Sequence, residues 1–196
     1  MPRTKEANQR IREEQRTKIL EGALRVFAHK GMAATMSDVA ASAGVSQGLA
    51  YRYFPSKEAL FKELIEQATQ SGMALMQQVQ KLSGTPGERL NFLISKSLEN
   101  MREHSEFYQF SAQIFDDETM PEDSRNLLRK YGSAYQKLMR QMIVEAQAAG
   151  EIAADDPDQL LMVITACLDG LLAMRNSSQF KRQFPEAGII LRILKP

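Results

Sequence analysis

One stretch of the sequence decides the fold: Thr35-Met-Ser-Asp-Val-Ala-Ala-Ser-Ala-Gly-Val-Ser-Gln-Gly-Leu-Ala-Tyr-Arg-Tyr-Phe-Pro-Ser-Lys57. It predicts two very short helices, a tight turn and the start of a third helix. Thr35 can cap the first helix, and Asp38, three residues later, can complete a capping box. Gly44 ends that helix, because a residue just past a helix end often needs a positive φ, which glycine adopts without strain. Ser46 caps the second helix, which therefore begins at Gln47.

This segment resembles the DNA-binding domain of the TetR family of bacterial transcriptional repressors. The features that carry the resemblance are the Ala43-Gly44-Val45-Ser46 turn, Gly48, the Tyr51-x-Tyr53-Phe54 run and the Ser56-Lys57-Glu58-x-Leu60 helix start. The resemblance covers roughly the first third of the chain, and beyond it only the helical pattern and the length are similar. Ala50 departs from the family pattern, because a larger aliphatic residue is usual there.

The first residues of the second short helix are expected to meet base edges, as they do in helix-turn-helix proteins. An amide pairs with adenine and a guanidinium with guanine, which singles out Gln47 and Arg52. Arg52 lies further along the helix, so a phosphate contact stays open for it. The resemblance implies base contacts at Gln47, Gly48 and Leu49.

Phosphate contacts are expected beside these base readers. Thr35 and Ser46 lie at helix starts, where free N–H groups and the positive end of the helix dipole attract anions. The resemblance implies backbone contacts at Tyr51 and Lys57. For Tyr53 we keep two explanations open, a phosphate contact and packing between helices.

The N-terminus adds positive charge. Residues 1–9 are polar and lack a helix cap, so we expect a flexible basic arm. The cations at this end of the chain reach into the minor groove or along the backbone of DNA, or form a solvated tail. They are Arg3 and Lys5 in the arm and Arg10 and Arg12 just beyond it. Residues 1–60 carry 10 lysines and arginines against 6 acidic residues, whereas residues 61–196 carry 15 against 18. Basic charge therefore lies with the expected DNA-binding part.

The rest of the chain is predicted to be helical as well, because apolar residues recur three and four positions apart and strand-like alternation is rare. We predict an all-α protein with a three-helix DNA-binding domain at residues 10–55 and a helical domain at residues 56–196. The resemblance implies ligand binding and dimerisation in the second domain. Gly72 is a weak point in the helix that joins the two. Further helix starts are expected at Thr85-Pro86-Gly87-Glu88, Pro121, Asp156-Pro157 and Pro185.

Methionine and aromatic residues are frequent in the C-terminal half. Thioethers and rings adapt to a small apolar ligand, although ordinary core packing explains each residue taken alone. The resemblance, which implies a ligand pocket in this half, favours the pocket for the group Met101, Phe107, Phe110, Tyr131, Tyr135, Met139 and Met142. Asp169 is unusual in an apolar helix. It has three explanations: contact with a cationic ligand, a pair across a dimer, or a local kink with Gly170.

The run from Leu160 to Met174 is apolar on almost all sides, so it needs cover on two of them. One side can pack against its own domain, and the other can pack against a second subunit. We therefore expect a homodimer through this helix and the C-terminal helix, with Leu161, Leu168 and Leu172 at the contact. The run holds 15 residues including Asp169, which is short for a membrane span, so no membrane partner is expected.

Features of enzymes and metal proteins are missing from the sequence. It has two histidines and one cysteine, and no phosphate-binding glycine loop or nucleophile elbow. We expect no cofactor and no metal, since an acidic loop is more often solvated; its residues are Asp116, Asp117, Glu118, Glu122 and Asp123. The lone Cys167 excludes an internal disulfide and the N-terminus lacks an apolar signal segment, so we expect a cytoplasmic protein.

The resemblance thus implies a homodimeric repressor that binds a palindromic operator in double-stranded DNA and leaves it when a small apolar effector binds. An alternative is a DNA-binding architectural or cell-division protein of the same fold without a small ligand, which would have a filled core. An enzyme is a further alternative, and it would need a polar constellation that the C-terminal half does not offer.

Overall fold

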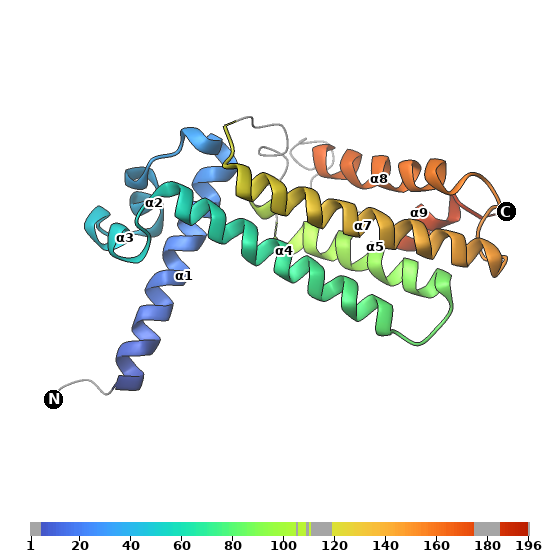
Figure 1. Ribbon diagram of the computed structural model, residues 1–196, viewed down its shortest axis with the longest axis horizontal. Helices are drawn as coiled ribbons and strands as arrows, with labels where there is room; N and C mark the ends of the chain where they lie inside the picture. The colour runs from blue at the N-terminus through green and yellow to red at the C-terminus, as the bar shows by residue number, and fades with distance from the viewer. Residues whose placement is uncertain (1–4, 105, 109, 111–118, 175–184, 196) are drawn as a thin grey trace. The chain divides into compact units, whose positions relative to one another are not determined.

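The computed structural model describes residues 5–104, 106–108, 110, 119–174 and 185–195. Within these ranges the chain forms helices and no strand, which confirms the all-α prediction (Figure 1). The elements are α1 (Lys5–Lys30), the 3₁₀ helix η1 (Gly31–Ala33), α2 (Met36–Ala43), α3 (Gln47–Tyr53), α4 (Lys57–Lys81), α5 (Pro86–Glu103), α7 (Glu122–Ala148), α8 (Pro157–Met174) and α9 (Ala187–Arg192).

Most helix starts lie where the capping residues predict them. The Thr35 hydroxyl accepts a hydrogen bond from the Asp38 N–H while the Asp38 carboxylate accepts one from the Thr35 N–H, so the capping box is complete. Thr85 and Glu88 form the same box at the start of α5. Gly44 has a φ of 66°, the left-handed conformation expected after α2. The last helix differs, because α9 begins at Ala187 and not at Pro185.

The chain divides into two compact units. The first comprises Met1–Ala68 and Glu106–Leu127, and the second comprises Thr69–Ser105 and Leu128–Pro196. These units differ from the predicted division after residue 55, because the first half of α4 and residues 106–127 group with the N-terminal helices. α4 is continuous through Gly72, so the expected weak point does not interrupt it.

Three phenylalanine rings form the centre of the first unit. Phe27 from α1, Phe61 from α4 and Phe110 are fully buried, and the Phe61 ring centroid lies 5.4 Å from that of Phe27 and 5.2 Å from that of Phe110. Edge-to-face pairs of this kind add to the stabilisation from burial. Phe110 is therefore a core residue of the first unit, and its predicted part in a ligand pocket stays a prediction. Phe107 lies beside it, with ring centroids 6.3 Å apart.

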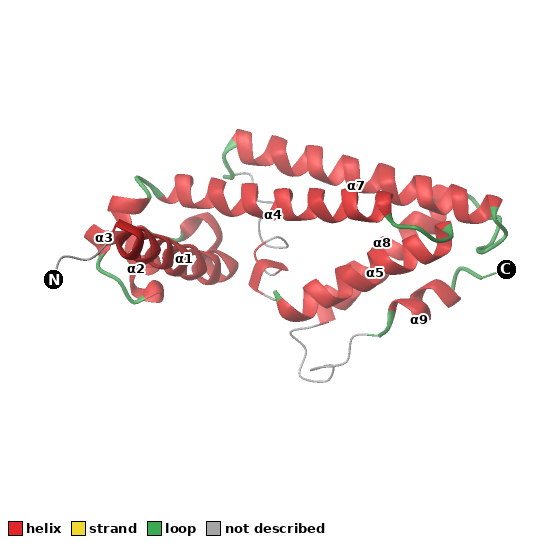
Figure 2. Cartoon of the chain, turned by 90° about the horizontal axis from the view of Figure 1, so that it is seen from below, coloured by secondary structure: helices red, strands yellow, loops and turns green. Residues whose placement is uncertain are grey.

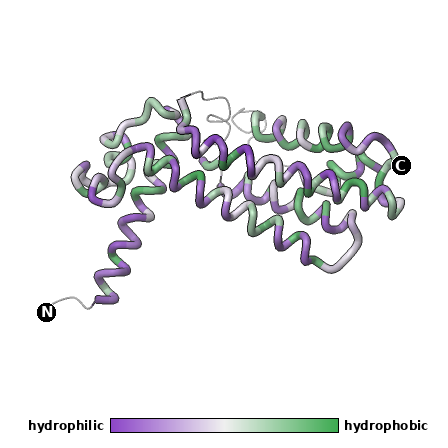
Figure 3. Tube along the Cα trace, in the orientation of Figure 1, coloured by the Kyte–Doolittle hydropathy of each residue, from purple (hydrophilic) through white to green (hydrophobic). Residues whose placement is uncertain are grey.

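The N-terminal segment also differs from its prediction. α1 begins at Lys5, so residues 5–9 are helical and do not form a flexible arm. No residue from Lys5 to Lys18 is buried, and Figure 3 shows this part of α1 as mainly hydrophilic. Pairs between Gln9 and Glu13 and between Arg10 and Glu14 stabilise it locally, and it contains no glycine or proline. Arg3 lies outside the described residues.

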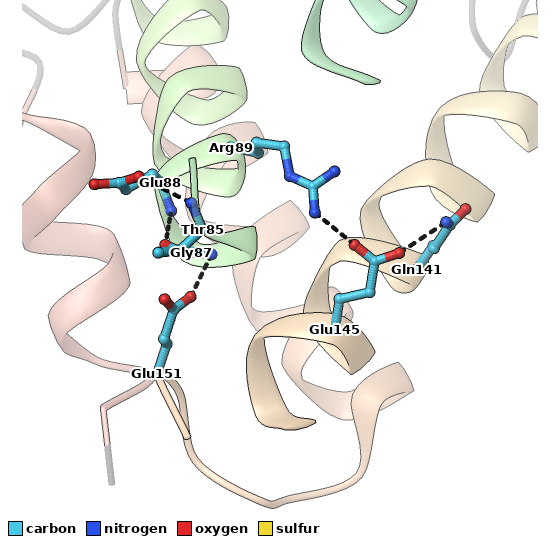
Figure 4. Close-up of polar contacts among 7 residues, drawn as sticks. All are labelled: Thr85, Gly87, Glu88, Arg89, Gln141, Glu145 and Glu151. Atoms are coloured by element: carbon cyan, nitrogen blue, oxygen red, sulfur yellow. Dashed lines mark hydrogen bonds and ion pairs between the residues drawn. The ribbon is translucent and has the colours of Figure 1, made fainter. Parts of the chain in front are cut away.

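The second unit is a bundle in which the end of α4, α5, α7 and α8 run lengthwise beside one another (Figures 1 and 2). Leu90, Leu93, Ile94, Ile143 and Ile164 are among its fully buried side chains. Polar contacts fasten the start of α5 (Figure 4). Arg89 pairs with Glu145 of α7 at 2.9 Å, and the Glu151 carboxylate accepts a hydrogen bond from the Gly87 N–H.

α8 has one buried and one exposed face. Leu160, Ile164 and Leu168 point into the second unit, whereas Met162 is 70% exposed. The prediction that Leu168 faces outward is wrong, since it is 7% exposed and belongs to the buried stripe. Among the described helices, only α8 is long and apolar enough to cross a membrane by length and composition, a test that core helices of soluble proteins also pass. Val163 and Met174 extend its exposed apolar surface.

Candidate nucleic-acid interface

α3 presents most of its surface to solvent. Gln47, Gly48, Tyr51 and Arg52 are exposed and Leu49 is half-buried, whereas Ala50 is completely buried. Of the residues predicted to read bases, Gln47 and Gly48 are therefore exposed at the N-terminal end of this short helix, and Arg52 is exposed in its last turn. The small Ala50 side chain, which departs from the family pattern, fits under α3.

The ends of α3 are held by residues around it. At its start the Ser46 hydroxyl accepts a hydrogen bond from the Leu49 N–H at 3.2 Å, and its own proton stays available for a phosphate oxygen. At its end Phe54 is buried, and the guanidinium of Arg16 lies 5.2 Å from the centre of its ring. Arg16 also pairs with Glu63 of α4 at 2.9 Å. One arginine of α1 thus connects α4 with the end of α3.

α2 packs unusually closely on α1. A Cβ atom at Gly22 would lie 2.8 Å from both the Cβ and the backbone nitrogen of Ala43, so only glycine permits this approach. Beside it, Arg25 donates hydrogen bonds to the Ser42 hydroxyl at 3.2 Å and to the Ser42 carbonyl at 2.9 Å. Gly22 and Arg25 were not predicted to matter here, although a glycine inside a helical pattern is a signal of close packing.

Asp38 anchors the other end of α2. Its carboxylate accepts hydrogen bonds from the Lys30 ammonium at 2.7 Å and from the Thr35 hydroxyl at 2.8 Å. These two partners lower the pKa of Asp38 to about 2. The Thr35 hydroxyl therefore both donates to Asp38 and accepts from its N–H. A phosphate at Thr35 would have to replace the first of these bonds beside a carboxylate, so this contact stays a prediction.

Lys57 lies at the first turn of α4 and is half-buried. Its ammonium donates a hydrogen bond to the Met32 carbonyl oxygen at 2.6 Å, which ties α4 to η1. An ammonium carries three donors, so two stay available for a phosphate. A cleft of about 580 Å³ opens beside Lys57, and the other residues around it are Lys30, Gly31, Met32, Ala33, Glu58, Thr119 and Pro121.

The seven residues predicted to line a ligand pocket belong to both units. Phe107 and Phe110 are in the first unit, and the other five are in the second: Met101, Tyr131, Tyr135, Met139 and Met142. The three methionines are buried, and the two tyrosine rings lie 6.4 Å apart. The Tyr135 hydroxyl is 3.5 Å from that of Ser97 on α5.

Both phenols favour their neutral form. Burial raises the pKa of Tyr131 to about 12, and the neighbouring Tyr135 adds to this effect. Burial also raises the pKa of Tyr135, with a further contribution from the negative charge of Asp169. Asp169 itself is exposed on α8, so its carboxylate is available to a partner outside the unit.

Within the ranges that the structure describes, no three histidine, cysteine or acidic side chains gather in a way that could hold a metal ion. Glu122 and Asp123 are exposed in the first turn of α7, where negative charge suits the helix dipole. Asp116, Asp117 and Glu118 lie outside the described residues.

Comparisons with known proteins agree along most of the chain. Residues 19–64 match the family model for bacterial regulatory proteins of the tetR family, and residues 83–172 match that for the tetracyclin repressor-like C-terminal domain. The HTH-type transcriptional regulator BetI of Rhizobium meliloti (strain 1021) is 31% identical over 161 residues, which cover 80% of this chain and 75% of BetI.

Two solved structures have the same fold. The ketosteroid transcriptional regulator KstR2 of Mycobacterium tuberculosis superimposes with a TM-score of 0.77 at 21% identity, covering 92% of this chain and 95% of KstR2. The transcriptional regulator FadR from Bacillus subtilis, solved in complex with stearoyl-CoA, has a TM-score of 0.66 at 19% identity and covers 90% of this chain and 96% of FadR.

The Asp38 anchor predicts a particular dependence of stability on pH. Because the pKa of Asp38 is lower in the folded protein than in the unfolded chain, its contribution is complete above about pH 4 and is lost as the pH falls through about 2. An Asp38→Asn variant should therefore be less stable than the parent at pH 7, and this gap should narrow between about pH 4 and pH 2. Urea unfolding across this range measures the gap, and a gap that does not change with pH would contradict the assignment.

A Lys30→Met variant is the matched control. It keeps the carboxylate but removes its largest stabilising partner, so the pKa of Asp38 should rise toward its ordinary value. Titration of the Asp38 carboxyl carbon by NMR reports this change directly.

Proposed function

Because the chain belongs to the TetR family of bacterial DNA-binding transcriptional regulators, we propose that it is a repressor that leaves its operator when a small effector binds. The observation that carries the proposal is the exposed N-terminal end of α3, with Gln47 and Arg52 on a helix held from both ends. A DNA-binding regulator works where the chromosome is, so we place the protein in the cytoplasm.

DNA recognition divides between two groups of residues in this proposal. Gln47, Gly48 and Leu49 meet base edges, because they open α3 and two of them are exposed. Ser46, Tyr51 and Lys57 contact phosphates, since each offers a hydrogen-bond donor beside that face. Thr35 is a weaker member of this group because its hydroxyl already donates to Asp38. Arg52 is exposed and suits either a guanine or a phosphate.

A homodimer would cover the apolar surfaces that α8 and α9 leave exposed. On α8 the residues are Met162, Val163 and Met174. Ile189 lies on α9, and Ile193, which is 63% exposed, follows directly after that helix. Apolar surface of this kind on two helices is typical of a protein contact. A two-fold dimer uses the same patch on both subunits and matches a palindromic operator. Asp169, exposed on the same helix, is available to pair across this contact.

An effector site in the second unit is supported by the relatives. KstR2 is named as a ketosteroid regulator, and FadR was solved in complex with stearoyl-CoA, a molecule with a long apolar acyl chain. The methionines and neutral tyrosines of α5 and α7 suit a ligand of that kind. Binding would shift α4, which runs continuously from the second unit into the first, and so alter operator affinity.

An architectural or cell-division protein of the same fold is the second candidate. The burial of Met101, Met139 and Met142 favours it, because each of the three is at most 5% exposed and fits an ordinary core. The two candidates differ in their response to ligands, since the architectural protein would bind DNA with unchanged affinity whatever small molecule is added.

Base and phosphate contacts should respond differently to substitution. Gln47→Ala should relax the preference at one position in each half-site, at a cost of about 1–3 kcal/mol on the preferred sequence. Lys57→Ala should weaken binding to all sequences alike and lower the salt slope by about one unit. Binding to operators selected from a random DNA pool, measured at several salt concentrations, tests both. Equal losses for Gln47→Ala on selected and random DNA would refute its role as a base reader.

Substitutions on the exposed face of α8 should dissociate the dimer. Met162→Glu places a charge at the centre of the proposed contact, and desolvating it there is unfavourable. Sedimentation at micromolar concentration should therefore show a monomer for Met162→Glu and a dimer for the parent. Val144→Glu is the matched control, because Val144 is an exposed apolar residue on α7 and should leave the dimer intact. A Met162→Glu variant that stays dimeric would exclude this face.

Effector and operator should weaken each other's binding. Titrating stearoyl-CoA and a ketosteroid against the operator-bound dimer should identify a compound that lowers operator affinity by about 5- to 150-fold. Linkage then requires operator DNA to reduce the affinity for that compound by the same factor. A compound that binds the second unit equally well with and without DNA would contradict the switch and leave DNA binding itself untouched.

A further inference from the structure

Gly72 of α4 and Tyr131 of α7 meet inside the second unit at unusually short range. A Cβ atom at Gly72 would lie 2.4 Å from the Cε2 and hydroxyl oxygen of Tyr131 and 2.6 Å from its Cζ. Real Cβ atoms essentially never approach other atoms this closely. The tip of the Tyr131 ring therefore rests on the backbone of α4 at the one position where the absent side chain makes room for it.

The surroundings of the Tyr131 ring restrict its movement away from Gly72. Tyr131 is only partly exposed, and burial is the main reason that its pKa is raised. Tyr135, one turn along α7, stacks at a tilt with its centroid 6.4 Å away, and its hydroxyl lies 3.5 Å from that of Ser97 on α5. Moving Tyr131 would therefore disturb neighbours on the inner side of α7 as well as the contact with α4.

The position of this contact along α4 gives it a wider effect. α4 is one unbroken helix from Lys57 to Lys81, and Gly72 lies four residues beyond Ala68, the last α4 residue of the first unit. At the other end of the helix, the Lys57 ammonium donates a hydrogen bond to the Met32 carbonyl oxygen of η1. Since no break separates Gly72 from Lys57, a displacement at Gly72 has a continuous helical path to the first turn of α4.

We propose that Tyr131 is a positioning residue whose ring, seated on Gly72, sets the spacing of α4 and α7 and thereby the operator affinity of the protein. This inference rests on the proposed function, because it assigns a regulatory contact within the same switch. A ligand that shifts the Tyr131 ring moves α4 directly, without any intermediate element. A side chain added at position 72 imitates that shift by forcing the ring and the helix apart.

The neighbouring Gly132 provides a matched control. It is also a helical glycine, one residue from Tyr131, but a Cβ atom there would meet nothing within 4 Å. Gly132→Ala therefore adds one methyl group in open space, and alanine is the better helix former. Gly72→Ala adds the same group against the Tyr131 ring.

The experiment measures the affinity of four variants for an operator selected by the parent protein from a random DNA pool, and for random DNA. Gly72→Ala should lose about fivefold or more in operator affinity while its affinity for random DNA and its far-UV circular dichroism stay unchanged. Gly132→Ala should stay within about twofold of the parent on both DNAs. Tyr131→Ala should also lose about fivefold or more, and adding Gly72→Ala to it should cause no further loss beyond about twofold.

Each outcome decides one question. An operator affinity of Gly72→Ala within about twofold of the parent would show that the contact is packing alone and would overturn the proposal, as would independent losses in the double variant. If Gly72→Ala does not fold, Tyr131→Ala decides, because unchanged operator affinity in that folded variant also overturns the proposal. A parent protein that selects no sequence from the random pool would instead refute the proposed function.

Discussion

The orientation of α3 depends on the close approach of α1 and α2 at Gly22 and Ala43. A helix of seven residues is not stable in water by itself, so α3 takes its position from what surrounds it. Gly22 lets α2 lie directly against α1, and Arg25 and Asp38 fasten the two ends of α2. With α2 held in this way, the left-handed Gly44 and the cap at Ser46 lead the chain directly into α3. Which face of α3 is exposed thus depends on how α2, the preceding helix, packs against α1.

The unit that carries α3 is not built from the N-terminal sequence alone. Phe110 comes from the segment between α5 and α7, yet its ring completes the core formed by Phe27 and Phe61. The first half of α4 belongs to the same unit. The chain therefore passes from the first unit to the second within α4, returns to the first unit at residue 106 and leaves it again after residue 127. Substitutions in residues 106–127 should for this reason affect the stability of the first unit.

The second unit combines an apolar interior with a few neutral polar groups. Methionines fill its core, while Tyr135 and Ser97 bring hydroxyls close together between α5 and α7. Both tyrosines hold their protons more tightly because of burial, so this region carries hydrogen-bonding groups without charge. One of its charged contacts, between Arg89 and Glu145, lies at the start of α5 (Figure 4). The outer face of α8 is different again, since Met162 is apolar and largely exposed.

The sequence by itself determined the features that depend on neighbouring residues. Caps at Thr35, Ser46 and Thr85 and the left-handed Gly44 could be predicted because each acts on backbone groups within three or four positions. The periodicity of apolar residues likewise established an all-α chain. The cap at Ser46 also predicted that α3 begins at Gln47, and this start identified the first residues of α3 as candidate base readers.

Only the tertiary structure decided which face of each helix turns inward and which distant segments meet. α8 is apolar almost all round, so its pattern could not distinguish the buried Leu168 from the exposed Met162. Phe110 lies 83 residues from Phe27 and its place in that core left no local signal. The sequence predicted a weak point at Gly72, because the contact that explains a glycine there is made with Tyr131, 59 residues away. Such contacts depend on the packing of whole helices, and a sequence pattern records only what occurs within one helix.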